Sequence, residues 1–113
     1  MALALNAYKT VTTVATTNAV GIYTAPVGYA GVILLANVAN VGSQTNTVSF
    51  SHRRTRTGTA VTTEIQRNAP IDSNDSISLV KGKLVVEPGD VLLISGSNNT
   101  DLKVTLSVLE TLI

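Results

Sequence analysis

Short runs of Val, Thr, Ile and Leu alternate along this chain with polar clusters that favour turns. The runs recur at intervals of about ten residues and show no helical periodicity, a spacing typical of a β-sandwich or barrel. We therefore expect an all-β, single-domain antiparallel β-sandwich, of jelly-roll or immunoglobulin-like type, with eight or nine strands. The expected strands lie near residues 8–15, 20–25, 30–40, 45–54, 60–67, 76–80, 83–87, 90–96 and 101–111.

Alternation within the longest runs predicts how each strand is buried, because successive side chains of a strand point to opposite faces. Residues 29–40 carry apolar side chains on both faces, so this strand is expected to be central and covered on two sides. One face would hold Val32, Leu34, Ala36 and Val38, and the other Ile33, Leu35 and Ala39. Residues 45–54 and 101–111 alternate apolar with polar positions, which predicts strands covered on one side only.

Residues 87–90, Glu-Pro-Gly-Asp, place Pro second and Gly third, as a type II turn requires. No linker or shift in composition divides residues 20–113, which are expected to form the sandwich. Residues 1–19 differ, being rich in Thr and Ala with few large apolar groups. They are interpreted either as an arm that adds a strand to a neighbouring subunit or as an edge strand of the same domain.

The amino-acid composition favours a surface that binds other proteins. Only 13% of the 113 residues are charged, against roughly 25% in typical soluble domains. Hydroxyls and amides must therefore cover most of the surface, either as contacts with partners or as a solvated face. A formal net charge of +1 gives no general attraction to nucleic acid or membranes. No signal peptide or apolar stretch of membrane-spanning length is seen, so synthesis in a cytoplasm is expected.

The sequence offers few candidate catalytic residues. Cysteine is absent, and the single histidine, His52, alternates with Phe50 and is interpreted as a residue at the end or rim of the core. The carboxylates are scattered and mostly fall at predicted turns, where they usually cap backbone amides. We therefore expect no catalytic residue, no cofactor and no enzyme activity. Turnover sensitive to His52→Ala or Asp90→Asn would overturn this expectation.

One segment offers oxygen ligands for a cation. Residues 72–76 read Asp-Ser-Asn-Asp-Ser, but a helix-loop-helix calcium loop would need Gly at position 77 and Glu at position 83. Ile77 and Lys83 stand there instead. The motif therefore fails, a weaker turn-type cation site stays open as an alternative, and no metal is expected.

The concentrated charge of the chain lies in His52, Arg53, Arg54 and Arg56, with Arg67 placed near them across a predicted hairpin. On a strand, His52, Arg54 and Arg56 share one face, and Arg53 points the opposite way. This basic tip is the candidate interaction site. Pairing with carboxylates of a partner protein is favoured over phosphate binding, because no aromatic residues are interleaved for stacking on bases. A solvated loop is the remaining alternative.

Four motifs together resemble a loose group of small tailed-bacteriophage virion proteins. They are residues 21–28 (Gly-Ile-Tyr-Thr-Ala-Pro-Val-Gly), residues 32–40, residues 84–92 with the Pro-Gly-Asp turn, and residues 104–110 with a final Ser-x-x-Glu. The resemblance spans about residues 20–110 and consists mostly of strand and turn chemistry. The basic tip and the N-terminal segment lie outside it.

The resemblance implies a non-enzymatic β-sandwich subunit of the virion, present in many copies. The first expectation is a capsid decoration or cement protein, most simply a homotrimer that contacts the major capsid protein. A neck, tail or fibre-attachment component is the second. A carbohydrate- or receptor-binding module is the third, although such sites usually stack sugars on exposed rings and few aromatic residues are available. The aromatic candidates are Tyr8, Tyr23, Tyr29 and Phe50.

Overall fold

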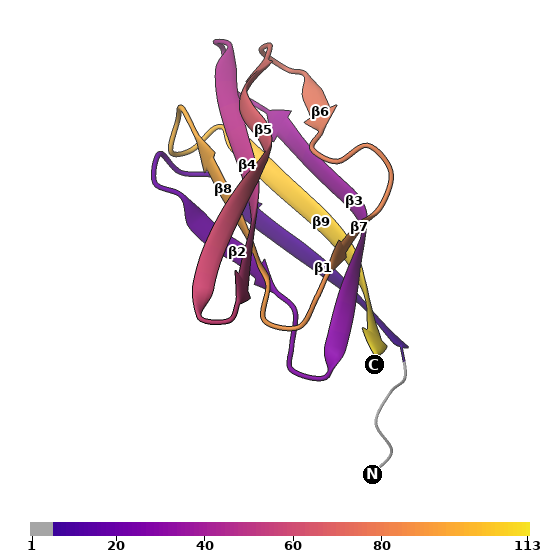
Figure 1. Ribbon diagram of the computed structural model, residues 1–113. Coiled ribbons are helices and arrows are strands. Elements are labelled where there is room, and N and C mark those ends of the chain that lie inside the picture. The colour runs from indigo at the N-terminus through magenta and orange to yellow at the C-terminus, as the bar shows by residue number, and fades with distance from the viewer. Residues whose placement is uncertain (1–5) are drawn as a thin grey trace.

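The computed structural model describes residues 6–113 and confirms the expected antiparallel β-sandwich (Figure 1). The nine expected strands all form, within a few residues of their predicted bounds, and the described residues contain no helix. The strands are β1 (Asn6–Val14), β2 (Val20–Thr24), β3 (Tyr29–Asn40), β4 (Asn46–Arg56), β5 (Thr59–Ile71), β6 (Ser76–Ser78), β7 (Leu84–Val86), β8 (Val91–Gly96) and β9 (Leu102–Leu112). Within residues 6–113, no helix has the length and apolar character that a membrane span needs.

The strand order is that of a jelly roll. Sheet A runs β1-β9-β3-β6, with β7 also paired to β3, and sheet B runs β2-β8-β4-β5. Both β6 and β7 pair with β3, so they act as one interrupted strand. If β6 and β7 are counted as one strand and the strands are renumbered along the chain, eight strands remain, in the sheet orders 1-8-3-6 and 2-7-4-5. The β4–β5 hairpin lies inside one sheet, and every other connection crosses between the sheets. This is the double Greek key of the jelly roll, which resolves the expected choice between jelly-roll and immunoglobulin-like folds.

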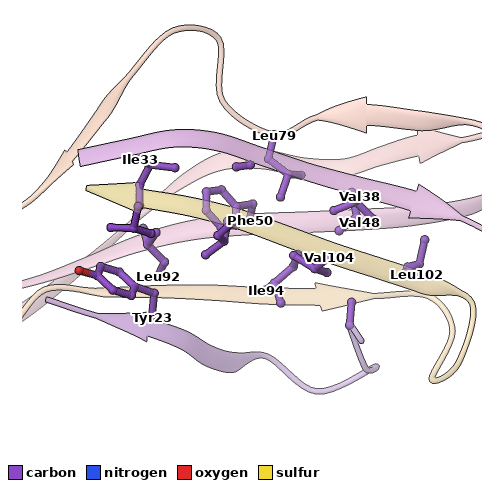
Figure 2. Packing of buried hydrophobic residues seen from close by; sticks show 14 of the residues in the cluster. Tyr23, Ile33, Val38, Val48, Phe50, Leu79, Leu92, Ile94, Leu102 and Val104 are labelled. Atoms are coloured by element: carbon purple, nitrogen blue, oxygen red, sulfur yellow. The ribbon is translucent and has the colours of Figure 1, made fainter. Parts of the chain in front are cut away.

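The core lies between the two sheets and is built from alternating positions of both. Figure 2 shows its packing. Sheet A contributes Ile33, Val38, Leu102 and Val104, and sheet B contributes Val48, Phe50, Leu92 and Ile94, all of them almost fully buried. The predicted one-sided burial of β4 and β9 is confirmed, because their apolar positions are buried and the intervening polar positions are partly exposed.

The predicted faces of β3 are wrong, because a bulge interrupts its alternation. The register with β9 shifts between Ile33 and Leu35, so an extra residue enters the strand. Ile33, Ala36 and Val38 face the core, whereas Leu34 and Leu35 are 41% and 46% exposed. The strand is central in sheet A but is covered on one side only, and its outer face carries apolar side chains.

The turn at residues 87–90 forms as predicted. The Asp90 N–H donates to the Glu87 carbonyl oxygen at 2.9 Å, and Gly89 has a φ of 85°, which favours glycine. This turn carries the chain from β7 in sheet A to β8 in sheet B.

Residues 6–14 of the N-terminal segment form β1, an edge strand of sheet A that pairs with β9 through nine consecutive residues. Residues 1–5 of the expected arm lie outside the described residues. Figure 1 shows β1 beside β9, and no other strand of residues 6–113 pairs with β1.

Candidate interaction site: a charged cluster at the end of β4

The core-facing row of β4 changes from apolar to basic as the strand leaves the core. Val48 and Phe50 fill the interior, and His52, Arg54 and Arg56 continue the same row toward the hairpin end. His52 pairs across the sheet with Leu92, which is itself buried. The basic side chains therefore point toward the end of the sandwich where the turn at residues 87–90 passes between the sheets.

Asp90 of that turn is the centre of the cluster. Its side chain is 1% exposed, and its two carboxylate oxygens contact three basic residues. Arg56 Nη1 lies 3.1 Å from Oδ1, His52 Nε2 lies 3.2 Å from Oδ2, and Arg54 Nε lies 3.4 Å from Oδ2. The backbone N–H of Glu87 also donates to Oδ2 at 3.2 Å, so Asp90 caps its own turn as well.

Glu87 completes the cluster from the surface side. Its carboxylate accepts from Arg54 Nη2 and lies 3.2 Å from Arg56 Nη2. Each arginine therefore bridges both carboxylates. Two guanidinium groups meet two carboxylates, so with His52 neutral the cluster carries no net charge.

Burial and hydrogen bonding act in opposite directions on the pKa of Asp90. Burial raises it, whereas hydrogen bonds from Arg56, His52 and the Glu87 backbone, with the positive charge of Arg56, lower it by more. The net pKa of Asp90 is below its ordinary value. The hydrogen bond to Asp90 is also the main cause that raises the pKa of Arg56. The charged forms of both residues are thus favoured in the folded protein.

The cluster fixes the turn that connects the two sheets to the end of β4. The turn that carries Asp90 joins β7 to β8, and the Asp90 carbonyl oxygen accepts from the Ala25 N–H at 3.2 Å. The Asp90 side chain binds β4, as described above. The carboxylate of Asp90 therefore connects the turn to the end of β4, and its backbone carbonyl oxygen connects the turn to the residue after β2.

The sequence prediction of the basic tip is only partly matched by the geometry. His52, Arg54 and Arg56 do lie on one face, and Arg53 lies on the other, where no carboxylate among residues 6–113 comes within ion-pair distance of it. Arg67 is not part of the cluster. It lies beside the register shift opposite Val48 and Phe50, and its Nη1 is 3.8 Å from Glu64 Oε1.

Sequence reasoning missed the partners of the arginines. It assigned the turn carboxylates to backbone capping and the arginines to a partner's carboxylates, whereas Asp90 and Glu87 of the same chain occupy both guanidinium groups. The only sequence signal for this pairing is a Glu-x-x-Asp turn of matching charge. The arginines and the carboxylates are more than thirty residues apart in the sequence, so a local pattern does not predict their contact.

A second buried polar group lies across Leu92 from the charged cluster, because Leu92 is opposite both Tyr23 and His52. Glu110 is 4% exposed and accepts a hydrogen bond from Tyr23 Oη at 2.7 Å, while Lys9 Nζ lies 3.2 Å from its other oxygen. Burial, with the adjacent carboxylate, raises the pKa of the Tyr23 hydroxyl. Gly31 makes room for the ring, because a Cβ there would lie 2.6 Å from Tyr23 Oη. This group joins β1 and β9 of sheet A to β2 of sheet B.

In residues 72–76, the segment considered as a weak cation site, polar side chains form hydrogen bonds with backbone groups. Asp75 Oδ1 accepts from the Ser76 N–H at 2.8 Å, and Ser73 Oγ donates to the Gly42 carbonyl oxygen at 2.6 Å. Among residues 6–113, no three His, Cys, Asp or Glu residues gather in a way that could hold a metal ion.

A polar hollow of about 290 Å³ lies on sheet B, lined by Thr17, Thr47, Ser49, Asn68, Ser95, Gly96 and Ser97. Its lining includes no aromatic ring on which a sugar could stack. Tyr8, the most exposed of the aromatic candidates, lies on sheet A instead.

Comparison with known proteins places the fold. No protein-family model matches the chain, and no curated protein sequence matches it. A chain from the acid-stable capsid structure of Helicobacter pylori bacteriophage KHP30 has a TM-score of 0.54 and 15% identity, covering 96% of this chain and 89% of that chain. A chain from Bacillus endospore appendages, described as disulfide-linked pili, has a TM-score of 0.46 and 20% identity, covering 96% and 88%. At 15% identity, the similarity to the KHP30 chain shows a shared fold.

Proposed function

We propose that this chain is a non-enzymatic structural protein of a bacteriophage virion, acting as a capsid decoration or cement protein. The observation that carries the proposal is the shared fold with a chain from a phage capsid, which extends over almost the whole length of both chains. Jelly rolls are also a common architecture of viral capsid proteins. The resemblance of residues 20–110 to small virion proteins, reached from sequence motifs, points in the same direction.

The surface is suited to binding other proteins through the burial of apolar and hydroxyl-bearing side chains rather than through charge. The outer face of sheet A carries exposed leucines, and Thr and Ser cover much of the remaining strands. Both carboxylates of the charged cluster are occupied by arginines of the same chain, so the cluster acts mainly to fix the shape of this end of the sandwich. The mechanism that we propose is the burial of surface against other particle proteins, with the major capsid protein as the main partner.

Several finer features belong to the proposal. The protein assembles as a homo-oligomer, with a trimer as the simplest form, and resides in the virion after synthesis in the bacterial cytoplasm. Arg53 and Arg67, which are free of the central cluster, are the members of the basic tip that remain available to a partner's carboxylates or to nucleic acid phosphates. A neck, tail or fibre-attachment role uses the same chemistry on another part of the particle.

The test is the mass of the purified protein by light scattering at low and high salt, before and after mixing with phage shells stripped of their minor proteins. A stable oligomer that binds shells in a stoichiometry matching positions of the capsid lattice is expected. Because area rather than charge provides the binding, high salt should reduce it little. A monomer that ignores shells at both salt concentrations would contradict the decoration role and favour a tail component or a ligand-binding module.

A further inference from the structure

Within residues 6–113, the outer edge of β1 is regular and no strand pairs with it. Its nine residues pair with β9 without a bulge, and they include no Pro or Gly. Every second residue therefore directs its backbone N–H and C=O away from the sheet. The other edges are less open to a new strand. β2 is short and bulged, β6 and β7 have three residues each, and β5 contains two register shifts and Pro70.

An apolar row crosses the outer face of sheet A and ends at this edge. Tyr8 lies opposite Leu109, Leu109 opposite Val32, and Val32 opposite Val85, so the four side chains are neighbours on four adjacent strands. Tyr8 and Val85 are 80% and 54% exposed. The row reaches the edge strand with its largest side chain, the ring of Tyr8, almost uncovered.

We propose that β1 pairs with β1 of a second copy of this chain, antiparallel and about a two-fold axis at Tyr8. Tyr8 then lies opposite the partner's Tyr8, Ala7 opposite the partner's Lys9, and Asn6 opposite the partner's Thr10. The two sheets join into one, their outer faces coincide, and the apolar rows of both copies meet in a Tyr–Tyr pair. Cross-strand aromatic pairs of this kind stabilise antiparallel sheets.

Two features place the two-fold axis at Tyr8: the charge of Lys9 and the continuity of the apolar row. An axis at Lys9 would place two ammonium groups directly opposite each other, which is destabilising. An axis at Thr10 would place Tyr8 opposite the partner's Thr12 and interrupt the apolar row. With the axis at Tyr8, Lys9 faces a small apolar residue instead.

Lys9 points inward from an edge strand, which in many proteins keeps a second strand away. Here its ammonium is 3.2 Å from the buried carboxylate of Glu110. The charge is therefore balanced within the same chain and leaves the edge available for pairing. This contact is pairwise and is argued from β1 and the apolar row, so it does not depend on the proposed virion role.

Cysteine cross-linking tests the contact directly, because the chain has no cysteine of its own. Directly opposed residues of antiparallel strands have Cα atoms about 4.5–5.5 Å apart, within the range that a disulfide spans. Full-length Tyr8→Cys is therefore expected to give a disulfide-linked pair on a denaturing gel after mild oxidation. Tyr8 is exposed, so the variant should keep the circular dichroism spectrum of the unmodified chain.

Two matched controls define the register. Thr12→Cys lies on the same edge and face, but its two copies would be about 25 Å apart in the proposed pairing, so it should not cross-link. Val61→Cys lies on β5, where it is also exposed, and should not cross-link either. Equal cross-linking of all three variants, or a folded Tyr8→Cys that stays unlinked, would overturn the proposal.

A substitution without cross-linking gives an independent result. Tyr8→Lys places two ammonium groups opposite each other at the axis and should lower the mass measured by light scattering, because copies joined through β1 separate, whereas Val61→Lys should leave the mass unchanged. An unchanged mass in Tyr8→Lys would contradict the pairing. Binding of that same variant to stripped shells reports on the virion role alone, so failure of one proposal is distinguishable from failure of the other.

Discussion

At the scale of single residues, Asp90 makes the most contacts in the charged cluster, because its carboxylate meets all three basic side chains. A buried carboxylate is costly unless it is paired and hydrogen-bonded, and Asp90 receives bonds from His52, Arg56 and the Glu87 backbone. The lowered pKa of Asp90 shows that these bonds outweigh its burial. The carboxylate therefore holds the turn at residues 87–90 against the end of β4.

The pH dependence of stability tests this role. Because the pKa of Asp90 is lower in the folded than in the unfolded chain, its stabilising effect is present above the unfolded value of about 3.9 and is lost as pH falls through the folded value. Asp90→Asn should cost about 1.5–3 kcal/mol at neutral pH. The difference from the unmodified chain should shrink below about pH 4. Urea unfolding across this range measures both.

Asp72→Asn is the matched control, because Asp72 is an exposed loop carboxylate. It should change the free energy of unfolding by less than about 0.5 kcal/mol at neutral pH. A difference between Asp90→Asn and the unmodified chain that is the same at pH 7 and pH 3 would show that the charge of Asp90 does not matter.

At the scale of elements, register shifts decide what the sequence pattern could not. Alternation located β3 correctly, yet the bulge between Ile33 and Leu35 moved the leucines to the outer face. A run of apolar residues looks the same with or without an inserted residue, so the sequence contains no sign of the shift. The exposure of both leucines on one face is a consequence of this irregularity.

The β4–β5 hairpin offers a prediction at this scale. Its two-residue loop, Thr57 and Gly58, has φ values of 54° and 81°, the positive pair of a type I′ turn. Thr is β-branched and disfavours such a conformation, whereas Asn tolerates it. Thr57→Asn should therefore stabilise the protein by roughly 1 kcal/mol in urea unfolding. Thr59→Asn, in the adjoining strand, should lower stability instead, and a neutral or destabilising Thr57→Asn would contradict the turn geometry.

At the scale of the whole molecule, the two sheets share a single core. Phe50 of sheet B is fully buried among residues of both sheets, and Tyr23 of sheet B reaches Glu110 of sheet A. The two sheets should therefore unfold together, as expected for a small domain.

Phe50→Ala tests this cooperativity. Loss of the ring should cost about 3–5 kcal/mol, because it removes buried surface and leaves a cavity. Circular dichroism and tyrosine fluorescence should report the same shifted urea midpoint. Two separate transitions would show that the sheets are independent units. Val61→Ala, at an exposed position of β5, is the control and should shift the midpoint little.

The sequence by itself determined the class of fold, the positions of all nine strands, the type II turn and the shared face of His52, Arg54 and Arg56. These features depend on alternation and turn chemistry, which act between residues that are close along the chain. The tertiary structure alone decided the jelly-roll order, the bulge in β3 and the pairing of the basic residues with Glu87 and Asp90. Each of these depends on which distant segments meet, and a local pattern of polar and apolar residues is compatible with several such arrangements.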